Sequence, residues 1–252
     1  MPSKPDLTLV LDLSACLSIG LVDSGNRTLS RRVKEQGARG ETAHTLIEEC
    51  LAEAGRDLAE VADICVGLGP GSFTGIRVCA ALAQGLAFAK RLPLHPFSSL
   101  AGILACVPGS MSPGNRADGC IAAIAANAGR YFVRCPSPPP PQAAVLGGRL
   151  EALLSAADTF SLASPRTVCV TAGNFPDRDR FRPEFHSLLR FEDVADFGDI
   201  ARMAHAAAPV LDGVLKPNYL MASAAEEKRR ADGHPAPDPG APAMPPPGDA
   251  PK

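Results

Sequence analysis

The chain opens with short apolar runs of strand length that are separated by turn residues. These runs are LTLVLDL at residues 7–13, CLSIGLVD at residues 16–23 and an extended piece at residues 27–33. Apolar runs of this length bounded by turn signals are typical of β-strands. We therefore predict a hairpin and a third strand at the start of the chain.

Helical spacing of apolar residues appears next, in residues 41–55, and predicts an amphipathic helix. Residues 63–69 (DICVGLG) are typical of a buried strand, residues 76–90 of a second helix and residues 93–96 of a short extended link. The segment SSLAGILACV, which begins at Ser98, predicts a third helix with a serine cap.

The second half of the chain repeats this order with a weaker signal. Residues 120–135 predict two strands joined by a turn at residues 127–129. A helix near residues 150–157, a strand at residues 166–173 and a helix at residues 199–208 follow. Both halves thus run from a strand hairpin to helices and further strands, which predicts a duplicated α/β architecture with mixed sheets.

The composition changes sharply near the end of the chain. From Ala231 to Lys252, 8 prolines and 3 glycines occupy half of 22 positions. Such a segment has too few apolar residues to fold, so we expect residues 228–252 to be a disordered tail. The remainder is long enough for two domains of about 100 residues each. We place them at residues 1–105 and 106–227.

Charge and cysteine content argue against several classes of protein. The net charge of −2 gives no global field for nucleic acid or an anionic membrane. The N-terminus lacks the pattern of a secretory signal, and no window reaches the length of a membrane span. The eight cysteines include no Cys-x-x-Cys pair. This spacing favours buried free thiols in a reducing compartment over disulfides or metal ligands.

The turn GPGSFTG at residues 69–75 has the composition of a phosphate cradle. A Walker loop needs Lys and Ser or Thr after its last glycine, but Ile76 and Arg77 follow Gly75. The dinucleotide fingerprint needs a glycine where Thr74 stands. Free amides at a helix N-terminus still attract anions, whereas Ser72 or Thr74 can cap them. The sequence favours a structural turn and leaves the ligand site open.

The helix after this turn is apolar on almost every side, with Arg77 and Gln84 as its strongly polar residues between positions 76 and 89. Such a helix must be covered on almost every side, and its small residues permit close packing against another helix. Two interpretations remain open: a core helix of a large domain, or a helical surface that binds a partner.

Other catalytic arrangements find little support. The five histidines have no H-x-x-x-H or H-E-x-x-H spacing, so we expect no metal site. The chain has no G-x-S-x-G elbow. Asp12 ends the first predicted strand. A carboxylate there could serve catalysis, but aspartate is equally common as a turn residue at the end of a strand.

A family resemblance covers residues 63–105, DICVGLGPGSFTGIRVCAALAQGLAFAKRLPLHPFSSLAGILA. This segment resembles the TsaB (YeaZ) family of tRNA threonylcarbamoyladenosine biosynthesis proteins, in which GPGSFTG precedes an alanine- and glycine-rich helix and then SSL. Weaker matches are the opening hairpin LVLDLSACLSIGLVD, the segment AHTLIEECL and the closing KPNYLMASAAEEK. The resemblance extends to about Glu227.

The resemblance implies a fold and a role. The fold is the two-lobed α/β fold of actin, Hsp70 and sugar kinases, a duplicated ribonuclease H-like architecture. The role is that of a cytoplasmic, non-catalytic partner of TsaD. TsaD is the metal-containing subunit that transfers threonylcarbamoyl to the adenosine next to the anticodon, in tRNAs reading codons that begin with adenine. TsaE, an ATPase, joins the assembly, and tRNA is reached through the complex.

The resemblance also implies where the functional residues lie. Two helices, at residues 41–54 and 72–90, would pair with TsaD or with a second copy of the chain. The expected interface residues are His44, Ile47, Leu51, Phe73, Ile76, Arg77, Ala80, Ala83, Gln84 and Ala87. The signature turn comprises Gly69, Pro70, Gly71, Ser72, Thr74 and Gly75. Asp12 and Ser14 mark a vestigial phosphate site, because no glycine follows Asp12. No cofactor is expected on this chain alone, and ATP or ADP at the complex interface is compatible with the resemblance.

Some residues depart from the family pattern, and two other functions stay open. Ala125 and Asn127 stand where the second hairpin usually carries Asp and Arg, so the roles of those residues do not transfer. The rivals are a self-sufficient, kinase-like ATPase and a glycoprotease-like peptidase. For the partner hypothesis we expect that Ala83→Glu leaves the monomer folded and abolishes TsaD binding.

Overall fold

A computed structural model describes residues 6–34, 43–107, 120–125, 130–134, 145–149, 168–172, 187–211 and 214–218. The predicted turn at residues 127–129, the helix near residues 150–157 and the tail at residues 228–252 lie outside these ranges, as does Asn127. Their predictions stay untested.

The first sheet contains the strands predicted at the start of the chain. Its order is β3-β2-β1-β4-β5, with β1–β2 and β2–β3 antiparallel and β1–β4 and β4–β5 parallel. The strands are β1 (Leu7–Asp12), β2 (Leu17–Val22), β3 (Thr28–Lys34), β4 (Val61–Gly67) and β5 (Leu94–Phe97). Side chains alternate between the two faces of a strand. Both faces are covered, which explains why β1 and β2 are almost continuously apolar.

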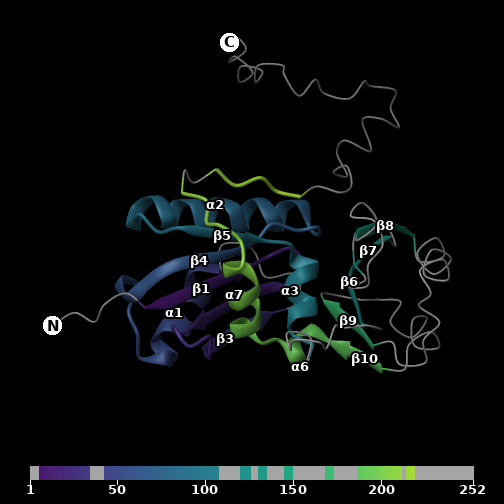
Figure 1. The fold of residues 1–252 in the computed structure, drawn as a ribbon, viewed down its shortest axis with the longest axis horizontal. Helices are drawn as coiled ribbons and strands as arrows, with labels where there is room; N and C mark the ends of the chain where they lie inside the picture. Colours follow the sequence, from purple (N-terminus) through teal and green to yellow (C-terminus); the bar gives the residue numbers. More distant parts are fainter. Residues whose placement is uncertain are drawn as a thin grey trace, which may run out of the picture. The chain divides into compact units, whose positions relative to one another are not determined.

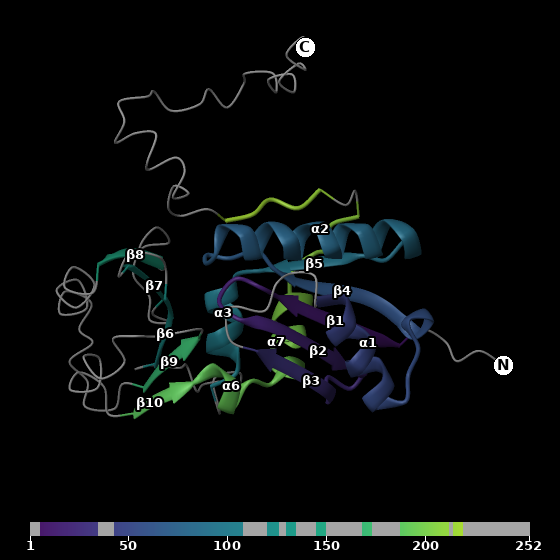
Figure 2. The same cartoon turned by 180° about the vertical axis from the view of Figure 1, so that it is seen from behind.

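Helices cover both faces of this sheet (Figures 1 and 2). Helix α1 (Ala43–Ala54) packs on β2 and β3, and α2 (Phe73–Lys90) packs mainly on β4. Helix α7 (Phe197–His205) packs on the other face, where the Phe197 ring fills the space that a side chain at Gly20 would need. Helix α3 (Ser99–Ala105) contacts α7, and η2 (Leu58–Glu60) and α6 (Phe191–Val194) are short connections.

A second sheet has the same topology as the first. Its order is β10-β9-β6-β7-β8, with β6–β7 and β7–β8 antiparallel and β6–β9 and β9–β10 parallel. The strands are β6 (Cys120–Ala125), β7 (Arg130–Arg134), β8 (Val145–Arg149), β9 (Val168–Ala172) and β10 (Ser187–Arg190). The prediction of a duplicated, ribonuclease H-like α/β architecture is therefore confirmed.

Several details differ from the sequence prediction. Strands β8 and β10 and the short helices η2 and α6 were not predicted. Ser98 occupies the N-cap position of α3, but its side chain makes no capping hydrogen bond. The predicted domain boundary between residues 105 and 106 stays a prediction. Helix α7 follows that boundary in the chain but packs on the first sheet.

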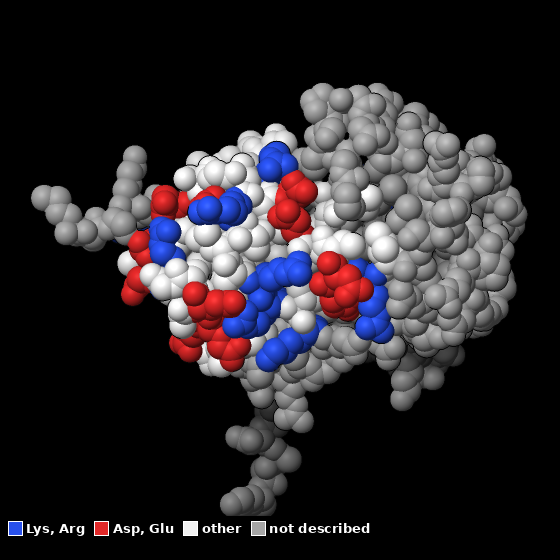
Figure 3. All heavy atoms as spheres, turned by 90° about the horizontal axis from the view of Figure 1, so that it is seen from below, with Lys and Arg blue, Asp and Glu red and all other residues white. Residues whose placement is uncertain are grey.

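Among the described residues, surface charges of both signs lie near each other. Figure 3 shows a short band of basic side chains flanked by acidic ones on the face that it displays. Arg32 of β3, for example, pairs with Glu49 and Glu53 of α1. None of the described helices is long and apolar enough to cross a lipid bilayer.

Five cysteines whose side chains the structure describes are buried free thiols, which confirms the prediction for these positions: Cys16, Cys50, Cys65, Cys79 and Cys106. Burial raises the pKa of the Cys106 thiol to about 12. Such a thiol is neutral at physiological pH and packs as a small apolar side chain.

Candidate functional site

The signature turn at residues 69–75 connects β4 to α2 at the carboxyl ends of the parallel strands. Gly69 has a φ of +89°, in the region that favours glycine. Its N–H donates to Ser99 Oγ at 3.0 Å, and its carbonyl accepts from Ser99 N–H at 2.9 Å. These two bonds fix the start of the turn against the beginning of α3.

Two amides at the start of α2 are already bonded within the protein. Ser72 is the N-cap of α2, and its Oγ accepts from Gly75 N–H at 3.2 Å. Ser72 N–H itself donates to the Ser14 carbonyl at 2.7 Å. The structure therefore favours the structural turn, with Ser72 as the cap, while Thr74 points to solvent.

The glycines of the turn permit close approach to the backbone after β1. A Cβ on Gly75 would lie 2.0 Å from the Leu13 carbonyl oxygen, and a Cβ on Gly71 would lie 2.4 Å from the Ser14 oxygen. Backbone atoms cannot yield as a flexible side chain can. The backbone of the turn is therefore in close contact with the segment that follows β1, with no room for side chains between them.

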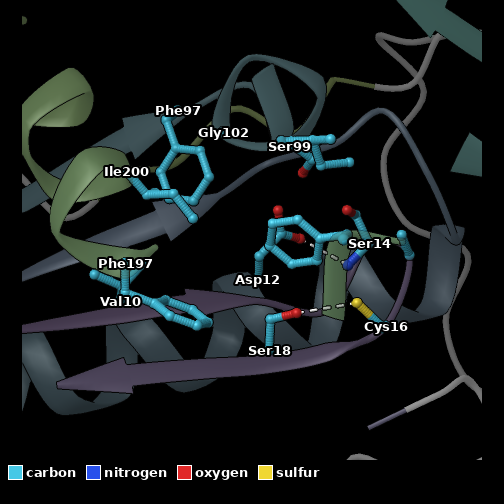
Figure 4. Close-up of a pocket in the computed structure, with 13 residues that line it drawn as sticks. Val10, Asp12, Ser14, Cys16, Ser18, Phe97, Ser99, Gly102, Phe197 and Ile200 are labelled. Carbon is cyan, nitrogen blue, oxygen red and sulfur yellow. Dashed lines mark hydrogen bonds between the residues drawn. The ribbon is translucent and has the colours of Figure 1, made fainter. Parts of the chain in front are cut away.

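Asp12 and Ser14, the expected vestigial phosphate site, line a small pocket beside the turn (Figure 4). Asp12 Oδ1 accepts from Ser14 N–H at 2.8 Å, and Asp12 occupies the space that a side chain at Gly67 would fill. Phe97 and Phe197 close the pocket on its apolar side. Its internal space of about 10 Å³ is close to what one water molecule needs.

Burial raises the pKa of the Asp12 carboxyl above its ordinary value of 3.8, although hydrogen bonds from Ser14 and Ser99 oppose the shift. Desolvation dominates because the pocket is small and largely apolar. The site therefore disfavours further negative charge, such as a phosphate.

Helix α2 has two different faces. Its buried face packs into the core of the first sheet and comprises Ile76, Cys79, Ala80, Ala83 and Ala87. On the opposite side Arg77, Ala81, Gly85 and Phe88 are exposed, and we call these four residues the exposed stripe. The guanidinium carbon of Arg77 lies 4.0 Å from the centre of the half-buried Phe73 ring.

Most expected interface residues lie in the core of the monomer. Ile47 and Leu51 of α1, together with Ile76, Ala80, Ala83 and Ala87 of α2, are buried against the first sheet. His44 and Arg77 are exposed, and Phe73 and Gln84 are half-buried. Ala83 has an exposed fraction of 0%, so its burial argues against the expectation that Ala83→Glu leaves the monomer folded.

The sequence analysis missed the apolar end of the exposed stripe. Phe88 is 90% exposed, and a Cβ on Gly85 would meet no atom within 4 Å. The positions 77, 81, 85 and 88 repeat at helical spacing. The sequence contains this period, but the buried face also has small and apolar residues at helical spacing. The pattern therefore does not tell which face is exposed.

Comparisons with known proteins agree with this geometry. A family model described as "TsaD: tRNA N6-adenosine threonylcarbamoyltransferase" matches residues 38–114, which contain α1, the signature turn, α2 and α3. The "tRNA threonylcarbamoyladenosine biosynthesis protein TsaB" of Haemophilus influenzae is 45% identical over 96 residues, or 36% of this chain and 39% of that protein. The TsaB of Escherichia coli is 38% identical over 55 residues, 22% of this chain and 24% of that protein. This chain is similar to the TsaB proteins over part of its length.

Two solved structures show the same fold. "YeaZ from Pseudomonas aeruginosa" has a TM-score of 0.54 at 22% identity, and the match covers 85% of this chain and 100% of that one. A structure described as an uncharacterized protein with similarity to peptidase YEAZ, also from Pseudomonas aeruginosa, has a TM-score of 0.63 at 24% identity. It covers 86% of this chain and all of its own. The sequence matches to the curated TsaB proteins named above span less than half of their length.

Proposed function

We propose that this chain acts in the biosynthesis of threonylcarbamoyladenosine in tRNA, as a non-catalytic subunit that pairs with TsaD through α2. The sequence match to TsaB proteins supports the pathway. The exposed stripe of α2 is the observation that carries the pairing, because it presents an aromatic ring and small residues to solvent.

The exposed stripe has the properties of a helix-packing surface. Leaving the Phe88 side chain in water forgoes about 1.5–3 kcal/mol of burial, which a partner could recover. Ala81 and Gly85 have almost no side chain, so the backbone of a partner helix can approach closely. Aromatic and arginine side chains are enriched where interfaces are strongest, and Arg77 and Phe88 lie at the two ends of the stripe.

The signature turn supports a structural role. The Gly75 and Ser72 amides bond to Ser72 and Ser14, and the neighbouring Asp12 pocket has room for about one water. In this proposal the turn sets the direction of α2, and the transfer chemistry belongs to TsaD. The rival kinase-like ATPase would need those amides to release their present partners.

The further members of the assembly are part of the same proposal. TsaE joins the TsaD pair, ATP or ADP is bound at the interface if it is bound by this chain at all, and tRNA is contacted through the complex in the cytoplasm. A homodimer would use the same stripe and would compete with TsaD.

The test is reconstitution of tRNA modification with TsaD and TsaE of the same organism, with and without this chain. We expect modified adenosine to form at an appreciable rate with the wild-type chain and with Ala59→Glu, a variant at an exposed position outside α2. We expect Phe88→Glu to reduce the rate at least tenfold. Equal product formation without this chain would contradict the proposal.

A further inference from the structure

Three metal-binding side chains converge at the other end of the first sheet from the signature turn. Asp63 lies near the start of β4, His95 near the start of β5 and His205 at the end of α7. Strand pairing places Cys65 opposite His95 and Thr8 opposite Asp63. Asp63 and His95 therefore share the sheet face on which α7 packs.

The side chains are close enough to act together. One potential ligand atom from each of Asp63, His95 and His205 lies within 4.8 Å of the others. His205 Nε2 is 3.1 Å from Asp63 Oδ1, and the two imidazole rings meet edge to face with centroids 4.5 Å apart. Two ligands bound to one zinc ion at about 2.0–2.1 Å each can be no more than twice that length apart. A small side-chain rotation would thus bring the three ligand atoms close enough to bind one ion.

The hydrogen bonding of His95 is incomplete within the described part of the chain. Its Nδ1 is buried and has no hydrogen-bond partner there. A ring nitrogen without a hydrogen-bond partner can offer its lone pair to a metal ion.

We propose that Asp63, His95 and His205 form a binding site for a divalent transition-metal ion of the zinc class. Two imidazoles and one carboxylate suit Zn²⁺, Co²⁺ or Ni²⁺ better than Mg²⁺ or Ca²⁺, which prefer oxygen ligands alone. The His205 and Asp63 side chains are 32% and 19% exposed, so water can complete the coordination shell.

The site would join α7 to the sheet that it covers. His205 and Asp63 are 142 positions apart in the chain, and a bound metal would replace their present hydrogen bond with coordination bonds to both side chains. Since the unfolded chain does not hold these ligands together, metal binding should stabilise the folded state. A His205–Asp63 hydrogen bond that merely anchors α7 predicts no such effect.

The experiment uses the full chain, freed of any affinity tag and dialysed against a chelator. Zn²⁺ is titrated by calorimetry and Co²⁺ by its visible absorption, with Mg²⁺ as the comparison ion. We expect one equivalent of Zn²⁺ to bind, visible Co²⁺ bands to appear, the melting temperature to rise with Zn²⁺, and Mg²⁺ to do none of these.

Three conservative variants, Asp63→Asn, His95→Gln and His205→Asn, are each expected to weaken Zn²⁺ binding at least tenfold. His44→Gln on α1 is the matched control, because His44 is exposed and outside the cluster, and it should bind as the wild type does. Circular dichroism of the metal-free variants checks that each is folded. Absence of Zn²⁺ binding to the wild type, or wild-type affinity in all three folded variants, would overturn the proposal.

Discussion

The two faces of α2 both carry small residues but have opposite surroundings. The buried face presents Ala80, Ala83 and Ala87 to the first sheet, and the exposed stripe presents Ala81, Gly85 and Phe88 to solvent. Position on the helix, rather than residue type, decides which alanine is in the core. Small residues on one face allow the helix to approach its own sheet, and on the other they leave room for a second molecule.

The largest difference is expected between two neighbouring alanines. Ala83→Glu places a charge at a position that is 0% exposed, and a buried unpaired charge costs about 3–5 kcal/mol. Ala81→Glu changes an exposed residue and should alter the free energy of unfolding by no more than about 0.5 kcal/mol. Urea unfolding of the two variants measures the contrast. Equal stability of the two would mean that α2 packs through a different face.

Two glycines give the next contrast, with opposite signs. Gly75→Ala places a Cβ against the Leu13 carbonyl and should destabilise the fold by about 1–3 kcal/mol. Gly85→Ala meets no atom within 4 Å in a helix interior and should stabilise it by about 0.5–1 kcal/mol. Thermal unfolding followed by circular dichroism tests both. A stabilising Gly75→Ala would show that the turn is not in close contact with the Leu13 backbone.

A smaller loss is expected when the cap of α2 is removed. Ser72→Ala deletes the Oγ that accepts from Gly75 N–H and should cost about 1 kcal/mol. Thr74→Ala, at an exposed neighbour, is the control and should cost less. If the Thr74 variant lost more stability in urea unfolding than the Ser72 variant, the cap would have been assigned to the wrong residue.

A further expected effect is a change in pH dependence. Because burial raises the pKa of Asp12, the folded chain binds this proton more tightly than the unfolded chain does. The wild-type free energy of unfolding should therefore fall as pH rises above about 3.8 toward the folded pKa. Asp12→Asn lacks this contribution, so its stability relative to the wild type should rise over that window. Urea unfolding from pH 4 to pH 8 measures the difference, and a stability of Asp12→Asn relative to the wild type that falls as pH rises would contradict the raised pKa.

Much of the first half of the fold could be predicted from the sequence. The apolar runs around Leu9 and Ile19 located β1 and β2, because both strands are buried on both faces. Helical spacing located α1, and Ser72 was one of the two caps considered for α2. These signals are local, so neighbouring residues in the chain are sufficient to reveal them.

The features that depend on packing could not be predicted in the same way. Strand β8 contains Gly147 and Gly148, which lack the side chains that mark a strand. The burial of Ala83 depends on which side of α2 meets the sheet, and an almost uniformly apolar helix carries little information about that. His95 and His205 come together because α7 returns to the first sheet, and their spacing in the chain gives no hint of it.

The most direct measurement is the affinity of this chain for purified TsaD from the same organism, for the wild type, Phe88→Glu, Ala81→Glu and the control Ala59→Glu. All four should unfold within about 0.5 kcal/mol of one another, since the changed residues are exposed. We predict that the two variants in the exposed stripe raise the Kd at least about 100-fold, or ~2.7 kcal/mol, while the control stays within about twofold. Wild-type affinity in both stripe variants would contradict the assignment of α2 as the partner surface.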